Sequence, residues 1–345
     1  PLDHPQLNFF IEQGNKIKKR AVVLGEITKE TVVFAIAGTH GKTTTASFLT
    51  HYFAYLNLEF TAFLGGIMIE YQSNLVQKGK KYSIVEADEY DRSFLQLFPD
   101  YACITAMDAD HLDIYGDHKN IKKAFDQFSK RVKHKVLVAK DLDKETCCYA
   151  LEDQANYRAE AIRVEGQGYR FDLVSPTQTY KNIYLRAMGR HNLSNAVGAL
   201  AILDLGGFPL EKVLPALSTF KGIQRRMEVF SLENKIVIDD YAHHPREIDA
   251  MFKTISEFYP DKTNMVVFQP HLFSRTKDFM GEFVDVLSRF DEIVLMDIYP
   301  AREQPIVGVN SDVLLELIKH NKKRKISKEA FRSTILDSEA DLVLV

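Results

Sequence analysis

Residues 32–45 read VVFAIAGTHGKTTT, an apolar run that leads directly into a glycine turn and a Lys-Thr pair. The run at 32–37 is typical of a buried strand, and the sequence from Thr44 to about Leu56 is typical of an amphipathic helix. Glycines in such a turn let backbone N–H groups point at phosphate oxygens, and the start of the helix adds a partial positive charge. The stretch therefore predicts a phosphate-binding loop and a nucleoside-triphosphate enzyme.

Two side chains of the loop have the chemistry that a triphosphate needs. Lys42 can reach the β- and γ-phosphates, and the Thr43 hydroxyl can ligate Mg²⁺. The loop is shorter than the common G-x-x-x-x-G-K-[ST] form, because Ile36 stands where the first glycine would be. Gly-Lys-Thr alone is frequent by chance, so the prediction depends on the strand before it and the helix after it.

Composition limits the classes of function. The chain has 345 residues, of which 46% are hydrophobic, enough for two or three domains with proper cores. A net charge of −3 gives no electrostatic case for a nucleic-acid partner. Cys103, Cys147 and Cys148 have neither zinc-site spacing nor a disulfide framework, which suits a reducing cytoplasm. No run approaches the roughly 18 apolar residues of a membrane span, so we expect no membrane insertion.

Alternating strand and helix patterns predict an α/β fold in three segments. Residues 1–30 are polar and irregular and end in an apolar run at 21–27 that we expect to be a strand. Residues 31–220 predict a central P-loop-type ATPase domain with a parallel sheet, and residues 221–345 predict a doubly wound, Rossmann-like domain. The expected strands are 32–37, 82–87, 101–106, 135–139, 235–239, 264–268, 292–297 and 341–345, with an antiparallel patch at 161–187.

Acidic residues follow two strands of the predicted central sheet. In open α/β sheets ligands lie beyond the carboxyl ends of the strands, where both 86–89 and 108–113 would be. Mg²⁺ prefers oxygen ligands, and we expect Glu86 to be one. His111 could hold a second divalent ion, which Mn²⁺ tolerates better than Mg²⁺. The alternative is that these acids are solvated loop charges.

Polar residues also follow the strands of the second predicted domain, at 239–245, 269–278 and 299–303. Adjacent side chains diverge, so we expect one of His243 and His244 to face a site and the other to be structural. The Arg225-Arg226 pair lies at the predicted hinge near 221–224 and could contact phosphate when the domains close. The alternative for this pair is a solvated linker.

Eight motifs occur together in one order. They are GTHGKTTT (38–45), EADEYDRSFL (86–95), DADHLDIYG (108–116), GRHNLSNA (189–196), RRM (225–227), DDYAHHPREI (239–248), FQPHLFSRTKDF (268–279) and DIYPAREQPIVGV (297–309). Together they resemble the Mur ligases of peptidoglycan synthesis, and most of all the members that add L-alanine. The motifs at 268–279 and 297–309 separate these members from the related ligase that recycles murein tripeptide, which shares other elements.

The resemblance implies three domains, which bind the UDP part, ATP and the amino acid in that order. Residues 1–30 resemble only the tail of the first domain and its linker, so we expect the N-terminal UDP-binding domain to be largely absent. Residues 31–220 then correspond to the central ATP-binding domain. Residues 221–345 correspond to a C-terminal amino-acid-binding domain that is incomplete at its end.

The implied reaction uses ATP to convert the carboxylate of UDP-N-acetylmuramate into an acyl phosphate, which the amine of L-alanine attacks. The expected partners are these small molecules, and the expected form is a cytoplasmic monomer or weak homodimer. Three alternatives stay open: the tripeptide-recycling ligase, a P-loop kinase or ATPase without an amide product, and a truncated nucleotide-binding core.

The resemblance also assigns roles residue by residue. The chemical step is implied for Lys42, Glu86, His111 and Arg226. ATP binding is implied for Gly38, Thr39, His40, Gly41, Lys42, Thr43, Thr44, His191, Asn192, Asn195, Arg226 and Asp240. Thr43 and Glu86 would hold Mg²⁺, and His111 a second ion, for which Mn²⁺ is possible. Substrate contacts are implied for Arg92, His243, His244 and Arg275. Family members often carry Arg where Leu272 stands, which leaves Arg275 as the better carboxylate ligand.

Overall fold

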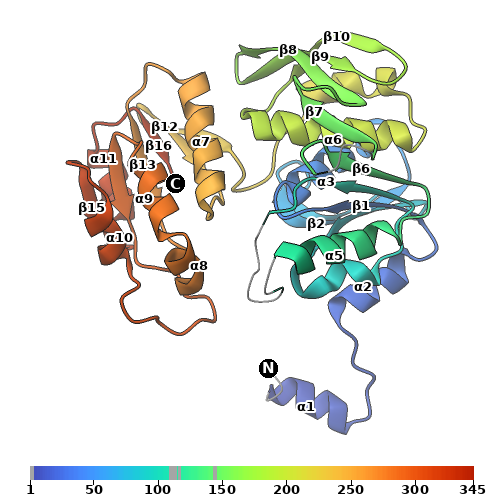
Figure 1. Ribbon diagram of the computed structural model, residues 1–345, viewed down its shortest axis with the longest axis horizontal. Coiled ribbons are helices and arrows are strands. Elements are labelled where there is room, and N and C mark those ends of the chain that lie inside the picture. The colour runs from blue at the N-terminus through green and yellow to red at the C-terminus, as the bar shows by residue number, and fades with distance from the viewer. Residues whose placement is uncertain (1–3, 109–114, 116–117, 143–145) are drawn as a thin grey trace.

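The computed structural model describes residues 4–108, 115, 118–142 and 146–345. Two sheets form two units that stand side by side, with the N-terminal helix α1 (Pro5–Glu12) apart from both (Figure 1). The central unit contains a ten-stranded sheet in the order β10-β9-β8-β7-β6-β5-β1-β4-β2-β3, and the C-terminal unit a six-stranded sheet in the order β11-β12-β16-β13-β14-β15. The α/β class with a large parallel sheet is therefore confirmed.

The central sheet is parallel in its middle and antiparallel at both ends. Its strands are β1 (Val32–Ala37), β2 (Phe60–Met68), β3 (Ser73–Gln77), β4 (Tyr82–Ala87), β5 (Tyr101–Ile104), β6 (Lys135–Ala139), β7 (Cys148–Leu151), β8 (Tyr157–Glu165), β9 (Gly168–Val174) and β10 (Thr179–Leu185). β1 runs parallel to both β4 and β5, and Ala37 pairs with Ala87 on one side and Ile104 on the other. The three carboxyl ends are therefore level.

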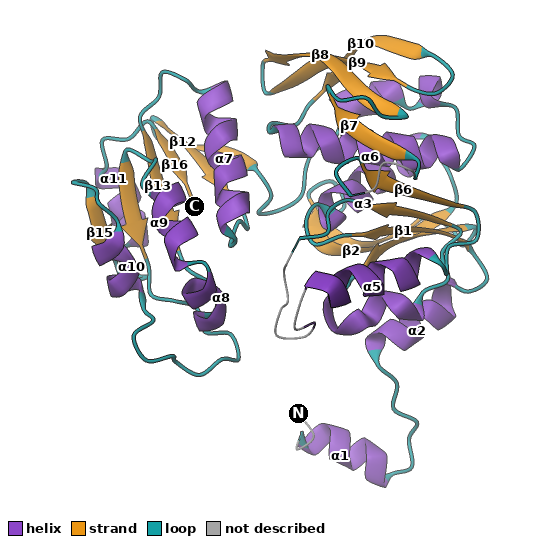
Figure 2. Ribbon diagram, viewed as in Figure 1, coloured by secondary structure: helices purple, strands orange, loops and turns teal. Residues whose placement is uncertain are grey.

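Helices cover both faces of the central sheet (Figure 2). One face carries α3 (Lys42–Tyr55), α6 (Arg190–Leu205) and the short helices η2 (Leu210–Lys212) and η3 (Leu214–Ser218). The other face carries α2 (Arg20–Thr28), η1 (Tyr90–Gln96) and α5 (His118–Ser129). Because β1 is buried on both faces, it reads as a continuous apolar run rather than an alternating one.

The C-terminal unit repeats this layering around a smaller sheet. Its strands are β11 (Glu228–Leu232), β12 (Lys235–Asp239), β13 (Asn264–Phe268), β14 (Glu292–Leu295), β15 (Lys323–Lys325) and β16 (Leu342–Leu344). Its helices are α7 (Pro245–Phe258), α8 (Phe273–Asp278), α9 (Met280–Leu287), α10 (Ser311–Leu317) and α11 (Phe331–Asp337). α7, α9 and α10 pack on one face of the sheet and α11 on the other, which is the doubly wound arrangement.

The chain passes between the units at residues 225–227. Residues 222–224 still belong to the central unit, because Ile69 N–H donates to Gly222 O (3.2 Å) and Gln224 N–H donates to Ile67 O (2.9 Å). Arg225 and Met227 then take left-handed backbone conformations, with φ of 56° and 51°. Non-glycine residues rarely adopt this conformation, so the crossing is a strained turn.

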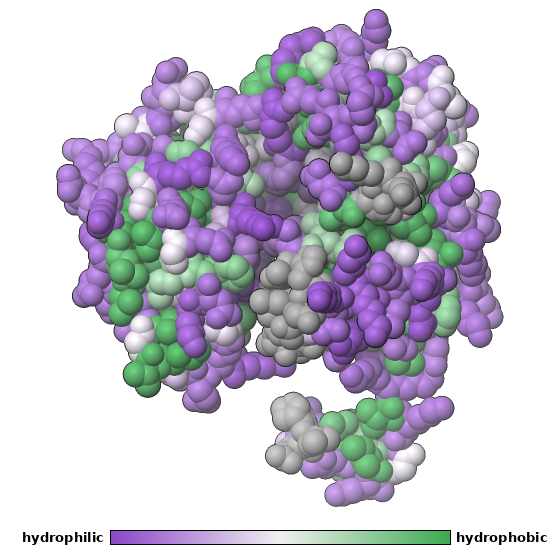
Figure 3. Space-filling view, viewed as in Figure 1, coloured by the Kyte–Doolittle hydropathy of each residue, from purple (hydrophilic) through white to green (hydrophobic). Residues whose placement is uncertain are grey.

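The strand expected at 21–27 is wrong, because this run lies inside helix α2. A short apolar run does not distinguish a strand from a helix, and tertiary packing decides. Here α2 lies so close to η1 that a Cβ on Gly25 would stand 2.3 Å from Gln96 O. Helix α1 exposes Phe9, Phe10 and Ile11, and forms the hydrophobic patch on the projecting segment in Figure 3. Among the described residues, no helix has the length and hydrophobicity to cross a membrane.

Gly168, the first residue of β9, tests the packing of the antiparallel strands β8, β9 and β10. A Cβ at this position would lie 1.9 Å from Leu185 O on β10, so Gly168→Ala must displace backbone. We expect it to lower the free energy of unfolding by about 1–3 kcal/mol, measured by urea denaturation. Gly281→Ala in α9 is the matched control, because its Cβ would meet no atom within 4 Å. That substitution should be neutral or stabilising by up to about 1 kcal/mol. Equal effects of the two would contradict this packing.

Candidate active site

The loop after β1 has the geometry of a phosphate cradle. Gly38 and Gly41 have φ of 137° and 78°, and α3 begins at Lys42. A Cβ on Gly38 would lie 2.3 Å from Thr105 Oγ1, and one on Gly41 would lie 2.5 Å from Asn195 Oδ1. Both positions therefore require glycine for conformation and for space. The predicted strand, glycine turn and helix are all present.

Lys42 is held above the loop by two oxygen partners. Its Nζ donates to Gly38 O at 2.6 Å and lies 2.7 Å from Glu89 Oε2. The Glu89 side chain is only 1% exposed, so this ion pair is screened little by water. Sequence reasoning did not single out Glu89, although the residue lies inside the motif at 86–95.

Thr43 and Glu86 form the predicted oxygen pair. Thr43 Oγ1 donates to Glu86 Oε1 at 3.0 Å, and Gly65 N–H donates to Glu86 Oε2 at 2.6 Å. Burial raises the pKa of Glu86, while the positive charge of Lys42 opposes the rise. Two adjacent hard oxygen donors beside a phosphate loop suit Mg²⁺. The described residues contain no group of three His, Cys, Asp or Glu side chains that could hold a metal, and the predicted ligand His111 lies outside the described part.

A cavity of about 290 Å³ lies between the two units, beside the loop. Its lining comes from both units and includes eight of the predicted ATP residues: His40, Gly41, Thr44, His191, Asn192, Asn195, Arg226 and Asp240. Tyr149 and Thr105 also line it, from β7 and from the end of β5. A nucleotide here would contact both units at once.

Asp240 links this cavity to the crossing between the units. Its Oδ2 accepts from Met227 N–H at 2.8 Å, which fixes the strained turn next to Arg226. Burial raises the pKa of Asp240 to about 6, and the Arg226 guanidinium opposes the rise. The Arg226 guanidinium also lies 5.6 Å from the centre of the Tyr241 ring, a cation–π arrangement.

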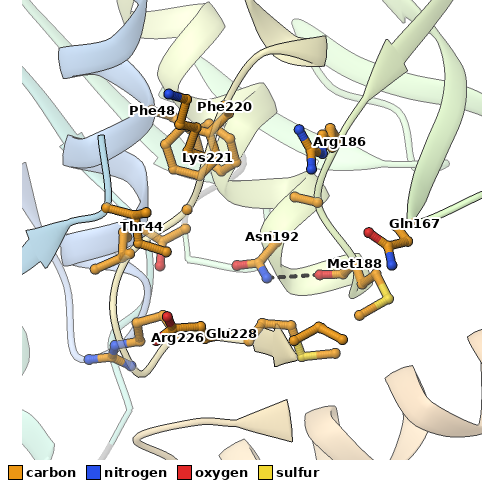
Figure 4. A pocket seen from close by; sticks show the side chains of 16 residues that line it. Thr44, Phe48, Gln167, Arg186, Met188, Asn192, Phe220, Lys221, Arg226 and Glu228 are labelled. Atoms are coloured by element: carbon orange, nitrogen blue, oxygen red, sulfur yellow. Dashed lines mark hydrogen bonds between the residues drawn. The ribbon is translucent and has the colours of Figure 1, made fainter. Parts of the chain in front are cut away.

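A second cavity, of about 230 Å³, adjoins the first at the crossing (Figure 4). Thr44, Asn192 and Arg226 line both cavities. The Asn192 side chain is oriented by the backbone just before α6, because its Nδ2 donates to Met188 O at 2.8 Å. Phe48 and Phe220, whose ring centres are 4.2 Å apart, form an apolar wall of this second cavity.

The third cavity, of about 670 Å³, lies at the carboxyl ends of the C-terminal strands. Asp240, His243 and His271 line it, and the ring centres of the two histidines are 5.9 Å apart. Arg275 Nη1 lies 3.3 Å from His271 Nδ1, so Arg275 belongs to the same cluster. His271 had been noted in its motif but given no role.

His244 and Arg92 occupy other environments. His244 is buried at the start of α7, accepts from Arg246 N–H at 3.2 Å, and packs 4.5 Å from the Phe279 ring. The two adjacent histidines therefore diverge, as expected. Arg92 lies in η1 with φ of 54°, and its guanidinium stands 5.1 Å from the Tyr115 ring centre. Neither residue lines the three cavities.

The cavity between the units determines the charge state of His191. Burial lowers the pKa of His191 to about 4, and Arg226 adds to the lowering, whereas Glu247 opposes it. An unfolded histidine titrates near pH 6.5, so between pH 6.5 and 4 only the unfolded chain binds this proton. The stability of the closed structure should therefore decrease as the pH is lowered, by at most about 1.4 kcal/mol per pH unit.

NMR titration of the imidazole measures this prediction directly, and we expect a neutral His191 at pH 6. Asp240, whose pKa is raised, contributes in the opposite sense, since its stabilising effect decreases as the pH rises from about 4 to about 6. The parent chain and His191→Gln share the Asp240 contribution, so comparing the pH dependence of their denaturation leaves only the effect of His191. A His191 that titrates at or above pH 6.5 would contradict the closed cavity.

Comparison with known proteins gives matches across the chain. Residues 36–203 match the family model of the Mur ligase middle domain, and residues 225–345 match that of the Mur ligase, glutamate ligase domain. The UDP-N-acetylmuramate–L-alanine ligase of Flavobacterium psychrophilum is 46% identical over 100% of this chain and 78% of its own length.

Solved structures show the same likeness. The crystal structure of the UDP-N-acetylmuramate–alanine ligase from Thermotoga maritima superposes with a TM-score of 0.85 and 26% identity, covering 100% of this chain and 78% of that one. The MurF ligase from Thermotoga maritima in complex with ADP has a TM-score of 0.73 at 16% identity, over 95% of this chain and 80% of that one, which is a likeness of fold. From the two family models and from relatives that match the whole of this chain, the chain belongs to the Mur ligase family.

Proposed function

We propose that this chain is an ATP-dependent ligase that joins L-alanine to the carboxylate of UDP-N-acetylmuramate during synthesis of the peptidoglycan precursor. The observation that carries the proposal is the position of Asp240, which lines both the cavity beside the phosphate loop and the cavity that His243 and His271 line; Arg275 contacts His271 but does not itself line that cavity. A nucleotide site and an amino-acid site are thus contiguous. Relatives that carry this activity in their names match the whole chain.

The chemistry explains why both cavities are needed. A carboxylate does not condense with an amine directly, because an oxide is a poor leaving group; phosphorylation from ATP supplies a good one. We assign to Lys42 the neutralisation of negative charge on the transferring phosphoryl group. Mg²⁺ held by Thr43 and Glu86 would add positive charge at the same oxygens. The ADP complex of the MurF ligase from Thermotoga maritima supports a nucleotide in this fold.

On the C-terminal side we assign L-alanine to the His243, His271 and Arg275 cluster. The planar guanidinium of Arg275 suits the bidentate recognition of an α-carboxylate. His244 is assigned an indirect part, because its side chain caps α7. Arg92 stays a predicted substrate contact, and His111 stays a predicted ligand of a second ion.

We propose an ATP-binding domain and an amino-acid-binding domain that meet at residues 225–227. This boundary lies a few residues beyond the one predicted at 221, because residues 222–224 hydrogen-bond to β2 and the segment after it. Closing the units around the substrates would exclude water from the acyl phosphate. Action in the cytoplasm, as a monomer or weak homodimer, remains a prediction.

Phosphate release from ATP tests the proposed function. We expect release to require both UDP-N-acetylmuramate and L-alanine, with Mg²⁺ present. Murein tripeptide in place of L-alanine is the control. Release that depends on tripeptide would identify the recycling ligase instead, and release without any amine would identify an ATPase.

Arg226 tests the assembly of the site from two units. Arg226→Ala removes a cation that lines the nucleotide cavity next to the crossing. We expect turnover to fall by about tenfold to a thousandfold, which is the range for loss of one charged contact in a transition state. Arg163→Ala on β8 is the control, since Arg163 is exposed and lines none of the three cavities. An unchanged turnover in Arg226→Ala would contradict the proposed closure.

A further inference from the structure

Glu247 is the third residue of α7, and its carboxylate serves both units. On its own side, Oε2 accepts from the backbone N–H of His243 at 3.0 Å and of His244 at 3.1 Å. Across the interface, Oε1 lies 3.3 Å from Nδ1 of His40, a residue of the phosphate loop. The carboxylate is only 19% exposed. One buried carboxylate thus contacts the loop and the backbone of the residue that lines the third cavity.

His40 is held from two sides. Its other ring nitrogen, Nε2, lies 3.4 Å from Oδ2 of Asp108, beyond the end of β5. Asp108 is itself tied to both units, because its N–H donates to Thr39 Oγ1 at 3.0 Å and its carboxylate pairs with Arg246 of α7. The imidazole therefore bridges one carboxylate from each unit.

The charge of Glu247 is maintained despite its burial. Desolvation on its own would raise the pKa of this carboxyl group. His40, His243 and the backbone N–H of His243 hold the pKa well below its usual range, so the group is ionised at neutral pH. Glu247→Gln therefore removes a charged acceptor from the backbone N–H groups of His243 and His244 and from the His40 imidazole, and hydrogen bonds to a charged group are stronger than those to a neutral one.

We infer that Glu247 is a positioning residue that couples the amino-acid side of the site to the phosphate loop through His40. The inference rests on the proposed function. When the units are together, the carboxylate fixes the backbone at His243 and the imidazole of the loop in one geometry. A nucleotide in the cavity beside the phosphate loop then favours the arrangement that L-alanine needs in the third cavity. L-alanine favours nucleotide binding in the same way, because such coupling is reciprocal.

The same helix supplies a control contact at its opposite end. Glu257 also crosses the interface, where it accepts from the Tyr169 hydroxyl at 2.5 Å and lies 3.3 Å from Arg190 Nε. This contact docks α7 on the central unit but touches neither the phosphate loop nor His243. Glu257→Gln therefore removes one charged contact between α7 and the central unit. Glu247→Gln also removes such a contact, and in addition removes the proposed coupling.

The experiment measures nucleotide affinity and turnover in four proteins: the parent chain, Glu247→Gln, His40→Gln and the double variant, with Glu257→Gln as control. Calorimetry with a non-hydrolysable ATP analogue, with and without L-alanine, gives the coupling independently of catalysis. We expect L-alanine to strengthen analogue binding in the parent chain and in Glu257→Gln, and to lose this effect in Glu247→Gln. We also expect Glu247→Gln to lower kcat by about tenfold to a hundredfold.

The double variant decides whether the two residues act together. If they do, the double variant should bind the analogue no worse than the weaker of the two single variants. Additive losses, or equal losses in Glu247→Gln and Glu257→Gln, would overturn the inference. If Glu247→Gln does not fold, as judged by circular dichroism, His40→Gln carries the same test from the other side of the contact. A parent chain without L-alanine-dependent phosphate release would overturn the proposed function instead.

Discussion

The level register of three parallel strands is the constraint on which the site depends. β1 pairs with β4 and β5 so that Ala37, Ala87 and Ile104 lie side by side. The phosphate loop, the acidic segment after β4 and the segment after β5 must then emerge at one edge of the sheet. Because parallel neighbours share hydrogen bonds along their length, the loops cannot shift independently of one another. A rigid, fully buried scaffold thus positions polar groups that would not stay together alone.

The contacts between the units have a different character. Within each unit, apolar side chains form continuous cores on both faces of a sheet. Across the interface, α7 is held by polar pairs at its two ends, through Glu247 and Glu257, and by Phe258, whose ring centre lies 5.1 Å from that of Tyr169. Individual pairs of this kind contribute on the order of 1 kcal/mol. We therefore expect the units to separate without unfolding, as substrate entry and product release in the proposed function require.

The sequence alone predicted the strands at 32–37, 82–87, 135–139, 235–239 and 264–268, because each is a short apolar run between polar loops. It failed at 21–27, where the apolar run is equally compatible with a helix and the packing of Gly25 on Gln96 decides. It also missed β2, whose alternating pattern is interrupted by Gly65 and Gly66, and the strands β3 and β7. Most of the parallel strands are thus visible as apolar runs, but the interior strands β2 and β7 were missed, so a place inside the sheet does not by itself make a strand recognisable in the sequence.

The candidate site, like the fold, could be predicted only in part from the sequence. The phosphate loop was visible because its function depends on backbone geometry, which glycine positions reveal. Glu89 and Glu247 were not, because a charged side chain acquires its role from a partner that lies far away in the sequence: 47 residues separate Lys42 from Glu89 and 207 separate His40 from Glu247. Both acids stand inside recognised motifs, yet nothing in their neighbours distinguishes them from solvated charges. Only the folded arrangement supplies that information.

One physical cause links the charge states around the nucleotide cavity. Burial raises the pKa of Asp240 to about 6 and lowers that of His191 to about 4, because a desolvated site disfavours both charged forms. A neutral imidazole provides hydrogen bonds but no positive charge. In the proposed function, the charge of the triphosphate is therefore balanced elsewhere, by Lys42 in the loop, by Arg226 at the crossing and by the proposed metal ion. Because Lys42 belongs to the central unit and Arg226 to the crossing between the units, we expect complete balance only when both units are together, so that chemistry follows closure.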